Sequence, residues 1–190
     1  MSKNKKQDGK SWAIKITFLT FFLSMTFNVI SESLVGNAGL VGALFVLFAI
    51  ILIGIICDMV GTAVTTEGVA PFNAMAANKV KGARKAVDLV KKASQVSNIC
   101  NDVIGDICGI ISGATVAIII VKIASIYNLK ETVVISVVLN GVVAALTVGG
   151  KAFGKHISMN NSTEIVRKAA VFVEFFSIKR RIKKWKPKKD

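Results

Sequence analysis

Four long stretches of apolar residues alternate with polar segments along this chain. The clearest is Leu40–Cys57, which holds 18 consecutive residues without a charge. About 20 predominantly apolar residues in a helix cross the hydrocarbon core of a bilayer, where backbone groups must be satisfied within the helix itself. The pattern predicts four membrane helices, near residues 14–32, 38–62, 97–125 and 132–150. The expected fold class is an all-α integral membrane protein.

Two further segments are amphipathic, which predicts helices lying along the membrane surface. After Pro71, apolar residues recur at helical spacing between residues 72 and 93, and basic residues lie largely opposite them. The apolar positions are Ala76, Val80, Ala83, Val87 and Val90. A second amphipathic helix is predicted at 163–183. For the first segment, the alternative is a solvated linker between membrane spans.

Charge is concentrated outside the apolar stretches. The chain has 25 Lys and Arg against 11 Asp and Glu, a net charge of +14 at pH 7, although 53% of its residues are hydrophobic. Basic residues gather before residue 16, between 64 and 98, and from Lys151 onward. This distribution predicts a multi-pass protein of the plasma membrane with both termini in the cytoplasm, facing anionic lipid headgroups. A nucleic-acid partner is not expected, and RNA binding by the basic tail is the weaker alternative.

The remaining signals in the sequence indicate no enzyme. The first apolar stretch could be a signal peptide, but its apolar part is long and Ser31–Ser33 makes a poor cleavage site, so a retained helix is expected. The three cysteines lack CxxC spacing and are interpreted as packing residues. They are Cys57, Cys100 and Cys108. The only histidine, His156, has no partner at a catalytic spacing.

Polar groups are placed at the start of the third apolar stretch. Asp102 and Asp106 lie four residues apart, and Asn98 precedes them by one turn on the same helix face. Ionisable residues at membrane depth usually face a bundle interior or a cavity and mark an ion path. Three glycines follow at the spacing that lets membrane helices approach closely. They are Gly105, Gly109 and Gly113. The alternative is that both carboxylates are solvated near the membrane surface.

Two other apolar stretches also end in a charged residue. Asp58 follows the second stretch directly and is succeeded by Gly61 and Thr62, while Lys151 follows the fourth stretch. The predicted topology places Asp58, Asp102 and Lys151 at the cytoplasmic ends of three different helices. These side chains could therefore meet.

The order of these segments resembles the transmembrane domain of the CorC and cyclin-M magnesium transporter family. The resemblance covers roughly Leu40–Phe176 and follows four short pieces in collinear order. They are Asp58 to Val64, in place of the family's Ser-x-x-Glu-Thr-Ala-Leu; Gly82 to Leu89, in place of Gly-Ala-Lys/Arg-x-Ala-x-x-Leu; Asn101 to Asp106, in place of Gly-Asn-x-Leu-Val-Asn; and Gly150 to Lys155, in place of Gly-Glu-x-x-Pro-Lys.

The resemblance implies a homodimeric transporter with a Mg²⁺ site lined by carboxylates and neutral oxygens between helices. The family binds the metal through serine hydroxyls, an asparagine and a glutamate, whereas this chain places Asp58, Asp102 and Lys151 at three of the corresponding positions and Gly61 at another. Hard divalent cations prefer oxygen ligands, so the two aspartates could preserve the site. The residues expected to hold the metal are Asp58, Asp102, Asp106, Asn98, Asn101 and Thr62, with the Ser97 hydroxyl as a further candidate. Lys151 is expected to modulate the site, either by extending to the headgroups or by pairing with a carboxylate.

On this basis the chain divides into three parts. A basic head and an extra membrane helix occupy residues 1–37, the CorC- and cyclin-M-like core 38–155, and an amphipathic helix with a polybasic tail 156–190. The regulatory nucleotide-binding domains of larger family members have no counterpart in the sequence, so control by nucleotide is not expected. The alternative function is a non-transporting membrane protein that uses the same fold for assembly or for binding an unidentified protein partner, with Lys151 neutralising the carboxylates.

Overall fold

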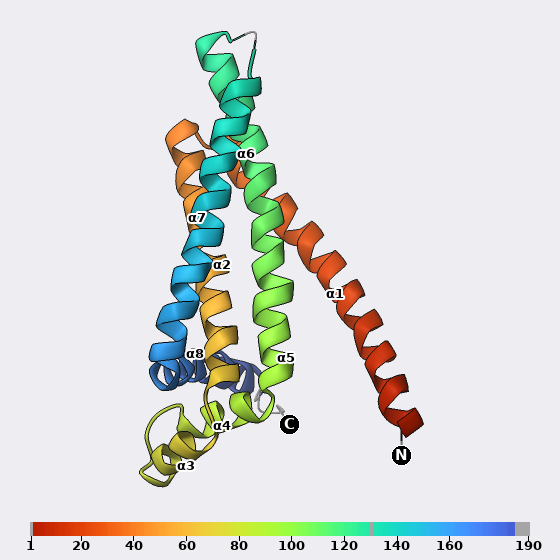
Figure 1. The fold of residues 1–190 in the computed structure, drawn as a ribbon, viewed down its shortest axis with the longest axis vertical. Coiled ribbons are helices and arrows are strands. Elements are labelled where there is room, and N and C mark those ends of the chain that lie inside the picture. Colours follow the sequence, from red (N-terminus) through yellow and green to blue (C-terminus); the bar gives the residue numbers. More distant parts are fainter. Residues whose placement is uncertain (1, 130, 185–190) are drawn as a thin grey trace, which may run out of the picture. The chain divides into compact units, whose positions relative to one another are not determined.

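The computed structural model describes the backbone of residues 2–129 and 131–184, and the side chains of residues 14–129 and 131–175. Every regular element in this part of the chain is helical, which confirms the all-α class there (Figure 1). The elements are α1 (Ser2–Asn37), α2 (Leu40–Thr66), α3 (Ala70–Ala77), α4 (Ala83–Lys91), α5 (Ala93–Ser97), the π-helix η1 (Asn98–Gly105), α6 (Asp106–Tyr127), α7 (Val133–Asn160) and α8 (Ser162–Lys184). The side chains of the basic head and of the polybasic tail lie outside the described residues.

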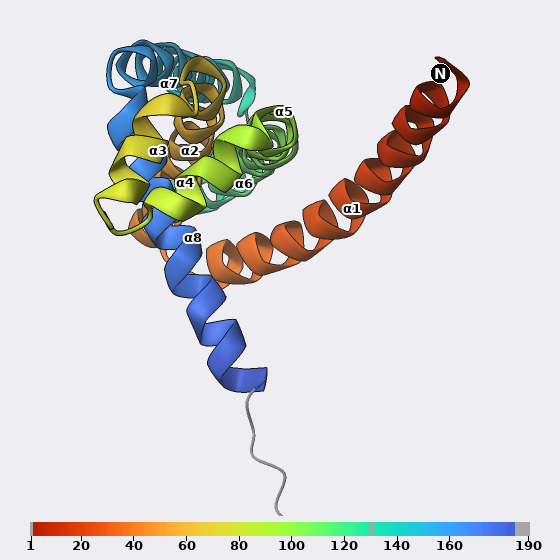
Figure 2. The same cartoon turned by 90° about the horizontal axis from the view of Figure 1, so that it is seen from below.

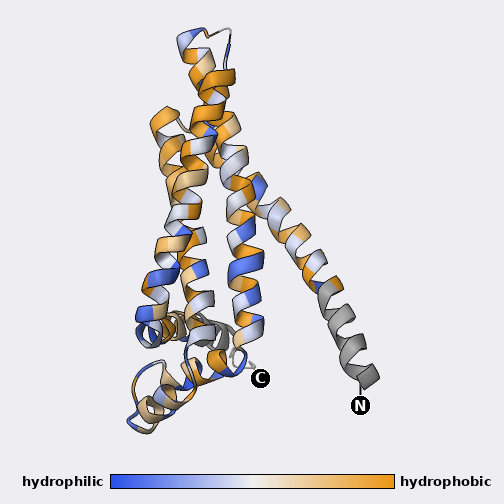
Figure 3. Ribbon diagram, in the orientation of Figure 1, coloured by the Kyte–Doolittle hydropathy of each residue, from blue (hydrophilic) through white to orange (hydrophobic). Residues whose placement is uncertain are grey.

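Four helical segments are long and apolar enough to cross a membrane, as the sequence predicts. They are Ile14–Asn37, Leu40–Thr66, Ala93–Tyr127 and Val133–Asn160. Figure 3 shows hydrophobic residues in orange along most of these segments, with hydrophilic residues interspersed in the stretch from α5 into α6. The chain therefore has the helices of a multi-pass membrane protein. The last segment continues well past the predicted end at residue 150, because charged side chains beyond that point do not interrupt backbone hydrogen bonding.

The predicted helix at 72–93 is two helices, and the prediction of one continuous element was wrong. Between α3 and α4, Lys79 has φ 56° and Gly82 has φ 81°, both in the left-handed region. A residue in this conformation ends a helix, and glycine adopts it without steric cost. The pattern of apolar residues continues across the break, so periodicity alone does not reveal it.

The third candidate span also departs from a regular α-helix. The backbone of η1 is wound as a π-helix, and α5 and α6 flank it on either side. Such wide turns are rare and are frequently found at functional sites. No pattern in the sequence predicts this one. It falls on Asn98, Asn101 and Asp102, three of the expected site residues.

Contacts divide the chain into two compact units. The first contains residues 1–53 and 106–147, and the second contains residues 54–105 and those from 148 onward. The boundaries pass through α2 and α7 and fall between η1 and α6. They therefore differ from the sequence-based division at residues 37 and 155, which follows motifs and charge rather than contacts.

In the first unit, the C-terminal turns of α1 pack against α6. The hydroxyl oxygens of Ser31 and Thr115 lie 3.2 Å apart, and both residues are buried. Lys122 Nζ donates to the carbonyl oxygen of Gly36 at 3.0 Å and to that of Ala38. Because the last carbonyls of a helix lack partners within it, this lysine caps the end of α1 from α6.

The second unit has a core made by the end of α2 together with α3, α4 and α8. Figure 2 shows α4 and α8 side by side. The buried residues are Ala63, Val64, Phe72, Ala86, Val90, Val166 and Ala170. A Cβ added at Gly82 would lie 2.6 Å from Val171 Cγ2, so α4 begins in direct contact with α8. The apolar face of α4 is therefore covered in large part by α8, and less of it is left to face lipid than the sequence suggests.

Candidate cation site

Asp58 is a buried carboxylate on the part of α2 that belongs to the second unit. The residue is 4% exposed, and its Oδ2 atom has no hydrogen-bond partner among the described residues. The nearest cation is Lys155 on α7, whose Nζ lies 3.7 Å from Oδ2. This distance forms an ion pair but exceeds that of a direct hydrogen bond. The Lys155 side chain is 51% exposed, so the pair joins a half-exposed ammonium to a buried carboxylate.

Small residues on α7 let α2 approach closely enough to bury Asp58. A Cβ at Gly150 would lie 2.3 Å from Ile55 Cδ1, and a Cβ at Gly154 would lie 2.8 Å from Met59 Cγ. Ser158, one turn further along α7 and fully buried, donates to the carbonyl oxygen of Met59. This four-residue spacing of small side chains is the pattern of close helix packing in membranes.

Two of the three glycines in the third span, where the sequence predicts a packing surface, make no such contact among the described residues. A Cβ at Gly109 or at Gly113 would meet nothing within 4 Å among the described residues. Spacing alone does not distinguish the two sets of small residues, because both recur every four positions.

Asn101, which is partly buried, is the second polar residue of the site. Its Oδ1 atom is buried without a hydrogen-bond partner in the described part of the chain, and its Nδ2 donates to Ser97 Oγ at 3.2 Å. A Cβ at Gly61 would lie only 2.0 Å from this Oδ1 atom. The side-chain amide of Asn101, held by η1, therefore occupies the space that a side chain at position 61 would need. Sequence reasoning treated Gly61 as a lost ligand and missed this role.

Two buried oxygens without hydrogen-bond partners among the described residues are thus associated with one turn of α2, because Asp58 belongs to this turn and Asn101 packs against it. Asp58 and Gly61 are three residues apart and share a helix face, and the amide oxygen of Asn101 lies against Gly61. Buried acceptors without a donor are rare in proteins, and a site of this kind calls for water or an ion. Carboxylate and amide oxygens are ligands that hard cations such as Mg²⁺ accept. This turn is therefore the candidate cation site.

The other predicted ligands are placed differently. Thr62 Oγ1 donates to the backbone oxygen of Asp58 at 2.9 Å within α2. Asn98 is partly buried, and Asp102 is exposed. Asp106 is also exposed and opens α6 in the first unit. Within the described residues, no group of three or more His, Cys, Asp or Glu side chains could share a metal. Of the predicted set, Asp58 and Asn101 each have a buried oxygen at or against the same turn of α2.

Lys151 takes neither of the two positions that the sequence suggested. Lys151 is partly buried. Its Nζ atom donates to the carbonyl oxygen of Gly105, the last residue of η1, at 3.4 Å. The lysine that pairs with a carboxylate is Lys155, one turn further along α7. The Lys151 ammonium thus contacts the last residue of η1, the helix that carries Asn101.

Glu67 is a polar residue of the second unit that sequence reasoning did not single out. It follows the end of α2 and accepts hydrogen bonds from the hydroxyls of Ser162 and Thr163, the latter at 2.9 Å. These bonds lower the pKa of Glu67 below its ordinary value of 4.5, and the Ser162 bond has the larger effect. The carboxylate sits at the N-terminus of α8, where negative charge is favourable. Glu67 therefore connects the end of α2 to the start of α8, which is far away in the sequence.

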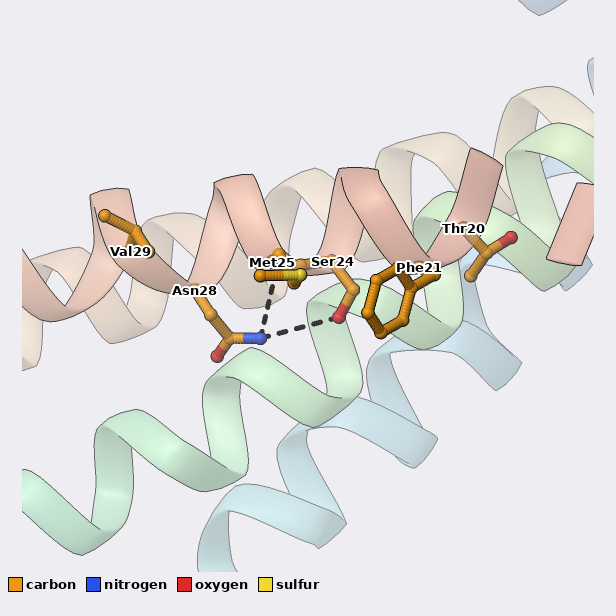
Figure 4. Close-up of a pocket in the computed structure, with 6 residues that line it drawn as sticks. All are labelled: Thr20, Phe21, Ser24, Met25, Asn28 and Val29. Atoms are coloured by element: carbon orange, nitrogen blue, oxygen red, sulfur yellow. Dashed lines mark hydrogen bonds between the residues drawn. The ribbon is translucent and has the colours of Figure 1, made fainter. Parts of the chain in front are cut away.

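Two further features of the described residues carry polar side chains. His156 is exposed, and its Nε2 atom lies 3.3 Å from Asn160 Nδ2. Along α1, a shallow hollow of about 420 Å³ contains Asn28, whose Nδ2 donates to the backbone oxygen of Ser24 at 3.1 Å (Figure 4). Its other lining residues are Thr20, Phe21, Met25 and Val29. The hollow is mostly apolar, so it suits a lipid chain or a helix better than an ion.

Comparison of the chain with models of known protein families, with characterised proteins and with solved structures finds no match in any of the three.

Proposed function

We propose that this chain is a multi-pass membrane protein that moves a divalent cation, Mg²⁺ in the first place, across the membrane. The observation that supports this proposal is the pair of buried oxygens without hydrogen-bond partners, Asp58 Oδ2 and Asn101 Oδ1. Leaving a buried polar group unpaired costs free energy, and a bound cation removes that cost for both oxygens at once.

Mg²⁺ suits a site with few protein ligands. It keeps several of its waters and is often bound through one or two carboxylates, so Asp58 and Asn101 could hold it with water completing the shell. Ser97 fixes the amide of Asn101 by accepting from Nδ2, which leaves Oδ1 to face the ion. Asp102, an exposed carboxylate on η1, is proposed to attract the hydrated cation toward the site.

The setting of the site belongs to the same proposal. The protein would lie in the plasma membrane as a homodimer with both termini in the cytoplasm, and its basic segments would contact anionic headgroups. The distribution of Lys and Arg along the chain supports this orientation.

A second candidate function is a non-transporting membrane protein that serves assembly or binds a protein partner. The ion pair between Asp58 and Lys155 favours it, because a tethered ammonium already neutralises the carboxylate. In that case the role of the site is structural, and no metal is needed.

The first experiment measures Mg²⁺ binding to detergent-purified protein by isothermal titration calorimetry, with uptake into proteoliposomes as the second readout. Asp58→Asn removes the buried charge at constant volume, and it should abolish binding and uptake. Asp102→Asn makes the same chemical change at an exposed residue of η1 and is the matched control, with a much smaller effect expected. Wild-type protein that neither binds nor transports Mg²⁺ would exclude the transport proposal.

A second experiment addresses the lysine. If Lys155 competes with the metal for Asp58, Lys155→Gln should tighten Mg²⁺ binding, while Lys151→Gln, which leaves the ion pair in place, should not. The two functions differ in the wild type. A wild type indifferent to Mg²⁺, beside a destabilised Lys155→Gln variant that Mg²⁺ restores, would show that the pair replaces a metal and favour the structural function.

A further inference from the structure

A basic pocket of about 250 Å³ lies in the second unit at the break between α3 and α4. Lys79, Lys81 and Arg84 line it from the break and the first turn of α4, and Glu174 lines it from α8. Ala76 and Val80 add apolar surface. All of these residues lie away from Asp58 and Asn101 in the sequence, and none has a part in the cation site.

The walls of the basic pocket are fixed by helix packing. Lys79 and Gly82 hold left-handed backbone conformations that bend the chain around the pocket. Gly82 begins α4 in contact with Val171, and Glu174 lies one turn further along α8 from that contact. Because the buried faces of α4 and α8 hold this arrangement, the charged side chains are presented by a defined scaffold.

The charges of the basic pocket are not neutralised by ion pairs in the part of the chain whose side chains are described. None of its four charged side chains takes part in the ion pairs formed among the described residues. Three cations and one carboxylate leave the pocket with a net charge of +2. Gly82 has no side chain to cap α4, so the backbone N–H groups of the first turn add to the positive potential. The pocket is therefore suited to a doubly charged anion.

The position of the basic pocket along the chain places it beside candidate membrane spans. The pocket-lining segment of residues 76–84 follows α2 after a short connection, and α8 follows α7 directly. Phe172 and Phe175 flank Glu174 on α8 and are 65% and 57% exposed. Basic and aromatic side chains gathered at the end of a membrane span are typical of the headgroup layer.

We propose that the basic pocket binds the headgroup of a phospholipid that carries two phosphate esters and a free hydroxyl, such as cardiolipin. The phosphates would accept from Lys79, Lys81 and Arg84, and the hydroxyl would donate to Glu174. Two phosphodiesters match the net charge of the pocket, and Arg and Lys donors form charge-assisted hydrogen bonds with phosphate oxygens. This inference goes beyond cation transport and does not depend on it.

The test is lipid competition on the detergent-purified protein, read by native mass spectrometry. Cardiolipin is offered against phosphatidylglycerol at twice the molar amount, so that the two lipids supply equal charge. The variant that removes the pocket cations is Lys79→Gln/Lys81→Gln/Arg84→Gln. The matched control removes three cations of the same segment that do not line the pocket, Lys85→Gln/Lys91→Gln/Lys92→Gln. General attraction between charges predicts equal effects of the two triple variants.

The wild type should prefer cardiolipin by about tenfold, and so should the control variant, whereas the pocket variant should lose the preference. Arg84→Gln alone should lose part of it, and this single exposed change serves if the triple variant folds poorly. An equal loss in both triple variants, or a wild type without preference, would overturn the proposal. Pyrophosphate supplies two phosphates without a lipid. If it displaces cardiolipin at equal phosphate concentration, the pocket takes a soluble phosphate and the lipid assignment is wrong.

Discussion

Gly61→Ala is the substitution that most directly tests how the candidate site is built. The added Cβ would lie 2.0 Å from Asn101 Oδ1, so the amide must leave its position. Displacement removes the hydrogen bond from Asn101 Nδ2 to Ser97 and leaves a polar amide to find new partners, which together cost about 2 kcal/mol. Alanine in a helix returns about 0.5–1 kcal/mol relative to glycine. The net effect is a destabilisation of about 1–1.5 kcal/mol.

The measurement is thermal unfolding of the detergent-purified protein. For a chain of this size, the expected loss lowers the unfolding midpoint by about 2–6 °C. Gly109→Ala is the matched control, because a Cβ there meets nothing within 4 Å. It should leave the midpoint unchanged or raise it. Gly61→Ala should also weaken Mg²⁺ binding under the transport proposal, since Asn101 Oδ1 is displaced from the site.

A double-mutant cycle separates this explanation from a general intolerance at position 61. With Asn101→Ala already in place, no amide occupies the space, and Gly61→Ala should cost nothing further. The helix preference for alanine, about 0.5–1 kcal/mol, is then unopposed, so the two substitutions should couple by about 2 kcal/mol. If Gly61→Ala has the same cost with and without Asn101, the amide does not fill this space and the geometry of the site is refuted.

Two other predictions concern contacts outside the candidate cation site. Because hydrogen bonds lower the pKa of Glu67, its contribution to stability is fully present above its ordinary value of 4.5 and is lost as the pH falls through the lowered pKa. Glu67→Gln should flatten this part of the pH profile of the unfolding midpoint, and equal slopes would contradict the assignment. Thr115→Val removes one partner of the buried Ser31 hydroxyl and should cost about 0.5–1.5 kcal/mol, measured by the same midpoint. Adding Ser31→Ala should recover part of that loss, and a further loss would argue against the bond.

The spans could be predicted because their signal is strong and local. A run such as 40–57 is long, uncharged and helical in any arrangement that satisfies its backbone. Helix ends were less predictable. The fourth span continues past Lys151 because a charged side chain does not stop a helix, and the amphipathic segment breaks at Lys79 and Gly82 although its apolar spacing runs on. Periodicity indicates which face is apolar but says little about where the backbone turns.

The candidate site was predicted only in part. Asp58 was found because a carboxylate directly after an apolar stretch is rare and costly. The role of Asn101 depends on the π-helix, which shifts residues relative to the spacing of an α-helix, and no residue pattern predicted that shift. Asp102 and Asp106, which fit α-helical spacing, are instead exposed. Gly61 could be understood only from the position of the Asn101 amide.

The Asp58–Lys155 pair connects the two candidate functions. A buried carboxylate needs a positive partner, and the 5% exposure of the Asp58 side chain leaves it little access to water. Lys155 supplies that charge when no metal is present, and its half-exposed side chain is not locked in place by surrounding residues. A divalent cation at Asp58 and Asn101 would therefore displace a tethered ammonium instead of entering a vacant negative site. This competition lowers the affinity for Mg²⁺, because the metal must displace the Lys155 ammonium from Asp58. On this argument, weak Mg²⁺ binding by the wild type that Lys155→Gln strengthens is the signature of transport. If Mg²⁺ does not displace Lys155 from Asp58 at any concentration, the ion pair has a structural role.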